Sequence, residues 1–284
     1  MKVGIHKGIP NEEYHADRTA VSSTWLKTIN KSPFHLRAML DSPPAEPTPA
    51  LTMGSAVDCL TFEPELWDKQ FIVAPKDLNR RTKEGKETWA KLMKDKRTVV
   101  SFAQYQEALA TTAAITTNPV MKDIMKSGES QLSFVWRDPV TGLLCKCRPD
   151  WYDEKSGTVV DLKTAQDASP KGFSRAIANF GYHIQQAFYS DGIRYCGKPV
   201  RRFIFGVMEK PDGRTVTEAD PRLMAFYELD EEDVQAGEDS YTSGLSAINF
   251  CMINDEWEGY TNRVVPISRP GWAKQDDVES VTAL

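Results

Sequence analysis

The chain has 284 residues, of which 40% are hydrophobic and 26% charged, and its formal net charge is −5. This composition allows a sizeable core, excludes wholesale disorder, and is not typical of a protein that simply coats nucleic acid. No run of 18 or more apolar residues and no apolar N-terminal stretch occurs, so we expect neither a membrane span nor a secretory signal. Five cysteines, an odd number, do not suggest a disulfide framework, and we expect a reducing, cytoplasmic location.

The first 126 residues predict a mainly helical region. Four prolines fall within residues 41–49, which predicts a loop there. Ser22 and Ser23 precede the first helical run and are candidates for its N-cap. The helical patterns cover residues 24–29, 35–40, 51–62, 101–117 and 119–126.

Residues 76–97 are the most basic part of the sequence, with nine Lys and Arg against four Asp and Glu. A solvated helix on which opposite charges lie three or four residues apart would account for this composition. An arm that contacts phosphates is the alternative, and the sequence leaves both open.

From Gln131 onward the sequence predicts strands, because segments rich in β-branched and aromatic residues are separated by turn signals. We expect strands in QLSFVWRD, GLLCKCRPDWYD and GTVVDLKT, a helix over 171–195, strands in RRFIFGVMEK and LMAFYELD around a polar segment, and a last helix over 230–248. This order predicts one mixed α/β domain over 1–265, with a helical part at 1–126, an α/β core at 127–265 and a polar tail at 266–284.

Two aspartates lie in a position to meet across the hairpin formed by the second and third of these strands. If the turn is residues 154–157, the antiparallel register places Asp150 opposite Asp161, with Cβ atoms about 4.5–5.5 Å apart. Directly opposed like charges destabilise a hairpin unless something neutralises them, and Mg²⁺ prefers carboxylate and carbonyl oxygens. Lys163 lies two residues from Asp161 on the same strand face, where its ammonium can act on an attacking water.

These residues also allow a simpler interpretation that involves no metal. The spacing of these residues is short, and Asp161 with Lys163 could form a surface ion pair contributing less than about 1 kcal/mol. The following helix adds weight to the metal site, because Gln185 and Tyr189, four residues apart, share one helical face.

RPDWYD, VVDLKT and QQAFY together resemble the PD-(D/E)xK nuclease superfamily, in its branch with a Gln-x-x-x-Tyr motif after the D-x-K strand. The segments NEEYHADRTAVSSTWLKTINKSP and MGSAVDCLTFEP are similar to the nuclease domain of the exodeoxyribonuclease VIII (RecE-type) family, and the resemblance runs from about residue 8 to about residue 260. It implies a restriction-endonuclease-like core, a central mixed β-sheet flanked by helices, with an N-terminal helical extension.

The resemblance also implies roles for individual residues. Asp150, Asp161 and the backbone carbonyl of Leu162 would bind the metal, and Lys163 would be the catalytic lysine. Gln185 and Tyr189 would organise the site and contact the DNA strand.

A first-helix metal ligand is usually a histidine in this family, and Asp58 stands at the matching position of Met53-Gly-Ser-Ala-Val-Asp58. Aspartate still ligates a hard cation, but it adds a negative charge that puts metal preference or activity in question.

Further polar residues are candidates for DNA contact or for an accessory role. Glu129, just before the first strand, would orient a water or a second metal, or it is an ordinary surface carboxylate. Recognition of a 5′ end would fall to Ser22, Ser23, Lys27 and Arg37, although Ser23 as an ordinary N-cap is the simpler interpretation. Arg148 is a further candidate for DNA binding.

The resemblance implies a Mg²⁺-dependent exodeoxyribonuclease, with Mn²⁺ as a possible substitute. It would degrade linear double-stranded DNA from 5′ ends and leave 3′ single-stranded tails for prophage or phage recombination. A homo-oligomeric ring and a single-strand-annealing recombinase partner belong to the same expectation. Two alternatives stay open: a structure-specific or single-strand nuclease on the same core, and a DNA-binding phage protein that has lost catalysis.

Overall fold

The computed structural model describes residues 1–43, 46–210 and 223–269; the whole of the expected polar segment at 212–220 and most of the tail lie outside the described residues. The helices are α1 Asn11–Ala16, α2 Ser23–Ile29, α3 Pro33–Asp41, α4 Pro49–Phe62, α5 Trp67–Gln70, α6 Lys83–Leu92, α7 Phe102–Thr117, α8 Pro119–Ile124, α9 Pro170–Phe180, α10 Tyr182–Tyr195 and α11 Glu231–Asn254, with a 3-10 turn at Pro64–Leu66. The strands are β1 Gly4–His6, β2 Phe71–Val73, β3 Thr98–Val100, β4 Glu129–Ser130, β5 Ser133–Arg137, β6 Leu144–Cys147, β7 Trp151–Asp153, β8 Thr158–Ala165, β9 Arg202–Glu209 and β10 Met224–Tyr227.

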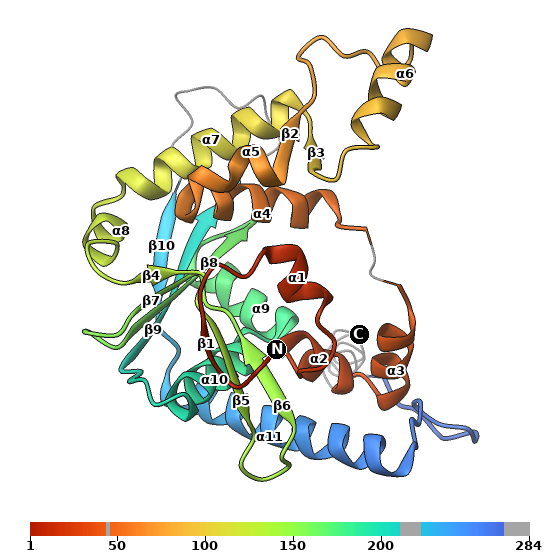
Figure 1. Cartoon of the computed structure of the whole chain (residues 1–284). Helices are drawn as coiled ribbons and strands as arrows, with labels where there is room; N and C mark the ends of the chain where they lie inside the picture. The colour runs from red at the N-terminus through yellow and green to blue at the C-terminus, as the bar shows by residue number, and fades with distance from the viewer. Residues whose placement is uncertain (44–45, 211–222, 270–284) are drawn as a thin grey trace, which may run out of the picture.

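A five-stranded sheet of order β10-β9-β8-β7-β4 forms the centre of the fold (Figure 1). Strands β8 and β9 are parallel over eight residue pairs, whereas the other neighbours are antiparallel. A parallel pair requires a crossover, and here α9 and α10 form it. The expected central mixed sheet is therefore confirmed.

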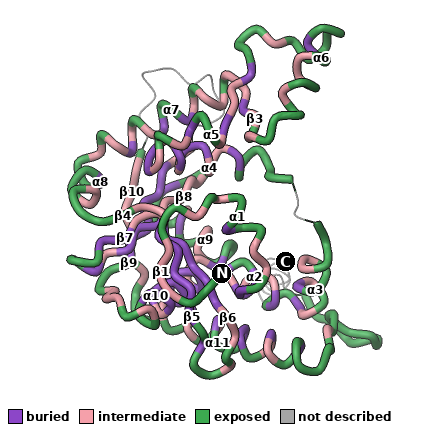
Figure 2. Tube along the Cα trace, viewed as in Figure 1, coloured by how far each residue is buried: buried purple, intermediate pink, exposed green. Residues whose placement is uncertain are grey.

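Helices cover both faces of this sheet. Side chains alternate along a strand, so neighbouring residues of β8 enter different cores. Val159 packs in a cluster with residues of α2, α10 and α11, whereas Val160 packs in a second cluster with residues of α4 and α7. Figure 1 shows α10 and α11 on one side of the sheet and α4 and α7 on the other, and Figure 2 shows the strands between them as buried. None of the helices in the described ranges has both the length and the apolarity to traverse a bilayer.

The strand expected over GLLCKCRPDWYD is divided, so this prediction was wrong in its extent. Residues of β6 pair with β5 in a three-stranded sheet, whereas β7 pairs with β8 in the central sheet. Pro149 lies between the two strands, and its lack of an N–H prevents a continuous ladder. The chain therefore changes sheets just before Asp150.

The helix expected over 171–195 is also two helices. Gly181 ends α9 with φ of 62° and ψ of 44°, the left-handed conformation that glycine adopts without a Cβ penalty. The break lets α10 start in a new direction, and this second helix carries Gln185 and Tyr189.

Close packing of α10 on α11 gives a testable stability prediction. A Cβ atom on Gly237 would lie 2.3 Å from the backbone oxygen of His183, which cannot move independently of α10. We expect Gly237→Ala to lower the free energy of unfolding by about 1–3 kcal/mol. The measure is urea denaturation. Gly54→Ala on α4 is the control: a Cβ there meets nothing within 4 Å, so its effect should be neutral to stabilising by up to about 1 kcal/mol. Equal effects of the two variants would contradict this account of the packing.

Candidate active site

Asp150 and Asp161 meet at the end of the β7–β8 hairpin. Trp151 lies opposite Val160 and Asp153 opposite Thr158, which is the register predicted from the sequence. Asp150 directly precedes Trp151, and its Oδ2 accepts a hydrogen bond of 2.7 Å from the backbone N–H of Leu162. Since Leu162 directly follows Asp161, this bond holds the Asp150 carboxylate against the strand that carries the second aspartate.

Lys163 completes the polar face of β8. Its ammonium forms an ion pair with Asp161 Oδ2, and the exposed fractions of the two side chains are 16% and 4%. The same ammonium lies 4.8 Å from the centroid of the Tyr182 ring, a cation–π distance. Burial disfavours the charged lysine, but the neighbouring Asp161 and Asp150 outweigh it and raise the pKa of Lys163 above its ordinary value. Lys163 is therefore a fixed positive charge at the site.

Helix α10 contributes Gln185 to the site. The side-chain amide of Gln185 donates a 2.7 Å hydrogen bond to Asp161 Oδ1. Lys27 of α2 donates to the Gln185 carbonyl oxygen at 3.4 Å, so α2, α10 and β8 are linked through polar atoms. Tyr189 is buried one helical turn further on, and its burial raises the pKa of its hydroxyl well above the ordinary value.

Asp58 of α4 is a third carboxylate at the same place. Its pKa lies well above the ordinary value because it is removed from water and because Asp150 and Asp161 add negative charge nearby. The same two causes, burial first and then the charge of Asp161, raise the pKa of Asp150 to about 7. Three acidic groups therefore share one region in which Lys163 contacts Asp161, and the balance of charge favours a bound cation.

The donor set fits a hard divalent ion. Within the described part of the chain, no three His, Cys, Asp or Glu side chains converge closely enough to form a complete ligand set by themselves. Mg²⁺ does not need such a set, because it usually takes one or two carboxylates and keeps several waters. Asp161 Oδ2 is buried without a regular hydrogen bond, and its partner is the Lys163 ammonium. Asp150 and Asp161 would supply the carboxylates, with the carbonyl of Leu162 and Asp58 beside them.

Arg148 and Ser23, two of the residues expected to contact DNA, lie in the interior next to Tyr14 and Tyr189. Arg148 is 8% exposed; its Nε donates to Ser133 Oγ at 2.8 Å, and its guanidinium lies 4.0 Å from the Tyr14 ring centroid. Its Nη2 has no hydrogen-bond partner in the described structure. Ser23 is buried at the start of α2, and its hydroxyl hydrogen-bonds to Tyr189.

The other candidates lie at the surface. Ser22 is the N-cap of α2 but makes no side-chain cap hydrogen bond. Arg37 pairs with Asp41 on α3 and lies over the Trp257 ring. Glu129 of β4 forms an exposed ion pair with Lys7. The contacts of Arg37 and Glu129 are therefore with residues outside the aspartate site.

Two residues that the sequence analysis did not select take part in the site. Gln131 has φ of 52°, unusual for a residue with a side chain, and it donates to Asp150 through both its backbone N–H and its side-chain amide. Tyr182 presents its ring to both Lys27 and Lys163. Tyr182 falls three residues before Gln185, so helical spacing offered a signal for it, whereas no local pattern marks Gln131.

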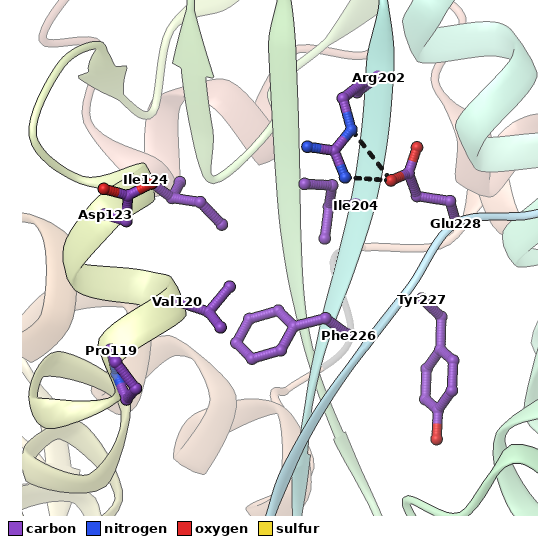
Figure 3. A pocket seen from close by; sticks show the side chains of 9 residues that line it. All are labelled: Pro119, Val120, Asp123, Ile124, Arg202, Ile204, Phe226, Tyr227 and Glu228. Atoms are coloured by element: carbon purple, nitrogen blue, oxygen red, sulfur yellow. Dashed lines mark hydrogen bonds and ion pairs between the residues drawn. The ribbon is translucent and has the colours of Figure 1, made fainter.

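A surface pocket of about 500 Å³ lies elsewhere, between α8 and strands β9 and β10 (Figure 3). An ion pair of Arg202 with Glu228 crosses it, and its other lining residues include Val120, Ile204 and Phe226. No candidate site residue lines this pocket. The candidate active site is thus identified by its charges and contacts rather than by a hollow.

Comparison with known proteins agrees with this architecture. The family model described as "PDDEXK-like domain of unknown function (DUF3799)" matches residues 22–265. The fold is similar to a crystal structure described as "Putative exonuclease" from Eubacterium rectale, with 18% identity and a TM-score of 0.60 over 93% of this chain and 97% of that chain. A structure described as a phage related exonuclease from Haemophilus somnus 129PT matches at 11% identity and a TM-score of 0.35, over 84% of this chain and 96% of that chain. No curated protein matches the sequence. PD-(D/E)xK nucleases generally use divalent metal ions.

Proposed function

We propose that this chain, which belongs to the family of PDDEXK-like domains (DUF3799), is a metal-dependent exodeoxyribonuclease of the exodeoxyribonuclease VIII (RecE) type. Its substrate would be linear double-stranded DNA, degraded from 5′ ends so that 3′ single-stranded tails remain. The cofactor would be Mg²⁺, with Mn²⁺ as a substitute. The family and the fold support a nuclease; the polarity and the type of substrate come from the sequence resemblance.

One observation carries the proposal: Asp150 and Asp161 are held side by side, and Lys163 contacts Asp161. Each aspartate is fixed by its own donor, Leu162 N–H for Asp150 and Gln185 for Asp161. Opposed like charges are expensive in a hairpin, so a structure that fixes both with hydrogen bonds is preorganised for a positive ligand.

The proposed chemistry is hydrolysis of a phosphodiester. A divalent ion bound by these carboxylates would lower the pKa of a water and stabilise charge on the phosphate. Lys163 places a permanent positive charge beside Asp161, where it stabilises negative charge that develops on the phosphate or its attacking water. Gln185 holds the Asp161 carboxylate in orientation, and Lys27 in turn holds the carbonyl oxygen of Gln185.

Contacts to the DNA strand would come from residues beside this centre. Arg148, Ser23 and Tyr189 are buried, so a phosphate could not reach them in this structure, and they would support the site from the interior. Lys27 of α2 is only partly buried and is the candidate contact that remains beside the site. Ser22, Arg37 and Glu129 lie further out and stay predictions without a contact to the site.

Digestion of end-labelled DNA tests the function. Linear duplex labelled separately at each 5′ end and each 3′ end, covalently closed circular duplex, and single strands are incubated with Mg²⁺, with Mn²⁺ and with EDTA. We expect early release of the 5′ label from the linear duplex, persistence of the 3′ label, intact circles, and no reaction in EDTA. Cleavage of circles or preferential loss of single strands would identify instead a structure-specific or single-strand nuclease. Absence of hydrolysis together with retained DNA binding would identify a protein that has lost catalysis.

The same resemblance extends the proposal to assembly and partners. A ring-shaped homo-oligomer would keep the strand enclosed, and a single-strand-annealing recombinase would receive the 3′ tail, in phage or prophage recombination. Sedimentation velocity of the chain with and without linear duplex tests the ring.

A further inference from the structure

We propose that the segment 76–97, with helix α6 at its centre, is an arm that holds the DNA duplex flanking the cleaved end through its phosphates. We call this segment the basic arm. The inference rests on the proposed function, because it assigns a second contact surface for the same DNA. It names a region that lies outside the aspartate site described above.

The charge of the chain is divided unevenly. The basic arm holds nine Lys and Arg against four Asp and Glu, a net charge of +5, whereas the other 262 residues hold 26 against 36, a net charge of −10. A strongly negative duplex is repelled by the remainder of such a chain at long range, so productive binding needs a local positive surface. The basic arm is a part of the sequence in which positive charge is concentrated.

Most cations of the basic arm form no ion pair within the described structure. Of the nine, Arg97 alone takes part in an ion pair among the described residues, with Asp95. Arg80 stacks on the Trp89 ring at 4.0 Å, which fixes the loop before α6 against the helix. Lys83, Lys86 and Lys91 are exposed along α6, and each of them is without an ion pair in the described structure.

The position of two lysines within α6 argues against a purely stabilising role. Lys83 is the first residue of α6 and Lys86 lies in its first turn. The helix macrodipole favours negative charge at that end and disfavours cations there. A solvated helix with opposite charges three or four residues apart would be stabilised by ion pairs, and none forms within the described α6, although Glu84 in the first turn and Lys91 in the last turn suit the macrodipole.

The base of the basic arm connects it to the elements that carry the aspartates. Strands β2 and β3 enter and leave the arm as a parallel pair. Phe71 of β2 and Val100 of β3 are buried in one cluster with Val57 of α4 and Val160 of β8. Asp58 and Asp161 directly follow Val57 and Val160, so the arm is anchored on the backbone that positions the carboxylates.

The arm stands away from the rest of the molecule. Figure 1 shows α6 projecting beyond α4 and the β2–β3 pair, and Figure 2 shows its surface as mostly exposed. A ten-residue helix is about 15 Å long, and duplex DNA carries one negative charge per ~1.7 Å of its axis. The lysines of α6 can therefore meet several phosphates of duplex that extends past the active site.

Salt-dependent DNA binding tests this inference. The probe is a fluorescent linear duplex of about 30 base pairs in EDTA, with the dissociation constant measured by anisotropy over a series of salt concentrations. Each phosphate contact contributes about 0.9 to the slope of log affinity against log salt. For Lys83→Gln/Lys86→Gln/Lys91→Gln we expect a slope reduced by about 2 to 3 and an affinity lowered about tenfold or more at ~100 mM salt.

The control removes the same charge elsewhere. Lys122→Gln/Lys126→Gln/Lys155→Gln changes exposed lysines in α8, just after it and in the β7–β8 turn, and Figure 1 shows α8 and this hairpin away from α6. Equal slopes for the arm variant and the control variant would overturn the basic arm as a DNA contact. If the unmodified chain hydrolyses and binds duplex but the arm variant is unchanged, the arm inference fails and the proposed function stands. If the unmodified chain neither binds nor hydrolyses any DNA, the proposed function fails and the arm inference falls with it.

Discussion

Lys163→Ala is expected to lower the rate of DNA hydrolysis by about 10²–10⁴-fold while the protein still folds. The ammonium of Lys163 is in contact with Asp161 and within the field of Asp150, so its loss removes positive charge from the place where the reaction develops negative charge. Single-turnover hydrolysis of linear duplex with saturating Mg²⁺ measures the effect and separates it from binding.

Folding survives this substitution for a physical reason. Truncation of one partner of a buried ion pair is usually costly, because it leaves the other charge unpaired. Here the acids can bind protons instead: Asp58 and Asp150 already have raised pKa values, and removal of Lys163 raises them further. We therefore expect the circular dichroism spectrum of the variant to match that of the unmodified chain. Its affinity for duplex in EDTA should stay within about threefold of the unmodified value. Lys198→Ala, which breaks an ion pair with Glu154 at the surface, is the matched control and should leave hydrolysis unchanged. Undiminished hydrolysis by the Lys163 variant would reject the role assigned to it.

Asp150→Asn is expected to abolish hydrolysis and to make the metal-free protein more stable at pH 8. The pKa of Asp150 is raised to about 7 in the folded state, first by burial and then by Asp161, whereas an unfolded chain has a value near ~3.9. When the folded-state pKa of a group lies above its unfolded-state pKa, the stability contributed by that group is fully present below the unfolded-state pKa. It is lost as the pH rises through the folded-state pKa. Without metal, the unmodified chain should therefore be more stable at pH 5 than at pH 8.

The size of this effect and its control follow from the environment. Because the Asp150 side chain keeps some contact with solvent, we expect the free energy of unfolding to differ by about 2 kcal/mol between pH 5 and pH 8, less than the full pKa shift would give. Asparagine retains an oxygen for the Leu162 N–H, so the hydrogen bond is kept. Because its amide does not titrate, the free energy of unfolding of the variant should depend less on pH. Asp153→Asn, at the end of β7, is the opposite control: hydrogen bonds from Ser156 and Ser127 lower the pKa of Asp153, and its replacement should destabilise the protein at pH 8.

Metal addition completes the test. At pH 8, Mg²⁺ should raise the free energy of unfolding of the unmodified chain, since a ligand that binds only the folded state stabilises it, and it should have little effect on Asp150→Asn. Chemical denaturation at the two pH values with and without Mg²⁺ measures all of these differences. A stability that rises from pH 5 to pH 8 in EDTA would contradict the assignment of a repelling carboxylate pair.

Local pattern determined much of the fold and the centre of the site. Alternation with a period of two in β7 and β8, together with a short turn, leaves one register that buries the apolar residues, and that register brings Asp150 to Asp161. The four-residue spacing of Gln185 and Tyr189 likewise places both on one side of α10. These features are predictable because they depend on residues that are neighbours in the chain.

Other features depended on how distant elements pack. Lys27 contacts Gln185 across 158 positions of sequence, and nothing local to either residue indicates this pairing. The burial of Arg148 between Ser133 and Tyr14, which strand alternation did not reveal, follows from the packing of β5 and of the N-terminal helix α1 around β6. The support of Asp150 by Gln131 similarly needs the turn before β5 to reach the hairpin.

The amino-acid sequence by itself determined the order of the longer helices and of the strands from β5 onward, the aspartate register and the unequal distribution of charge, since each of these is a property of residues close together in the chain. Only the tertiary structure decided where β6 separates from β7, where α9 ends, and which side chains surround the carboxylates, because burial and hydrogen bonding between distant segments exist only once the layers have packed.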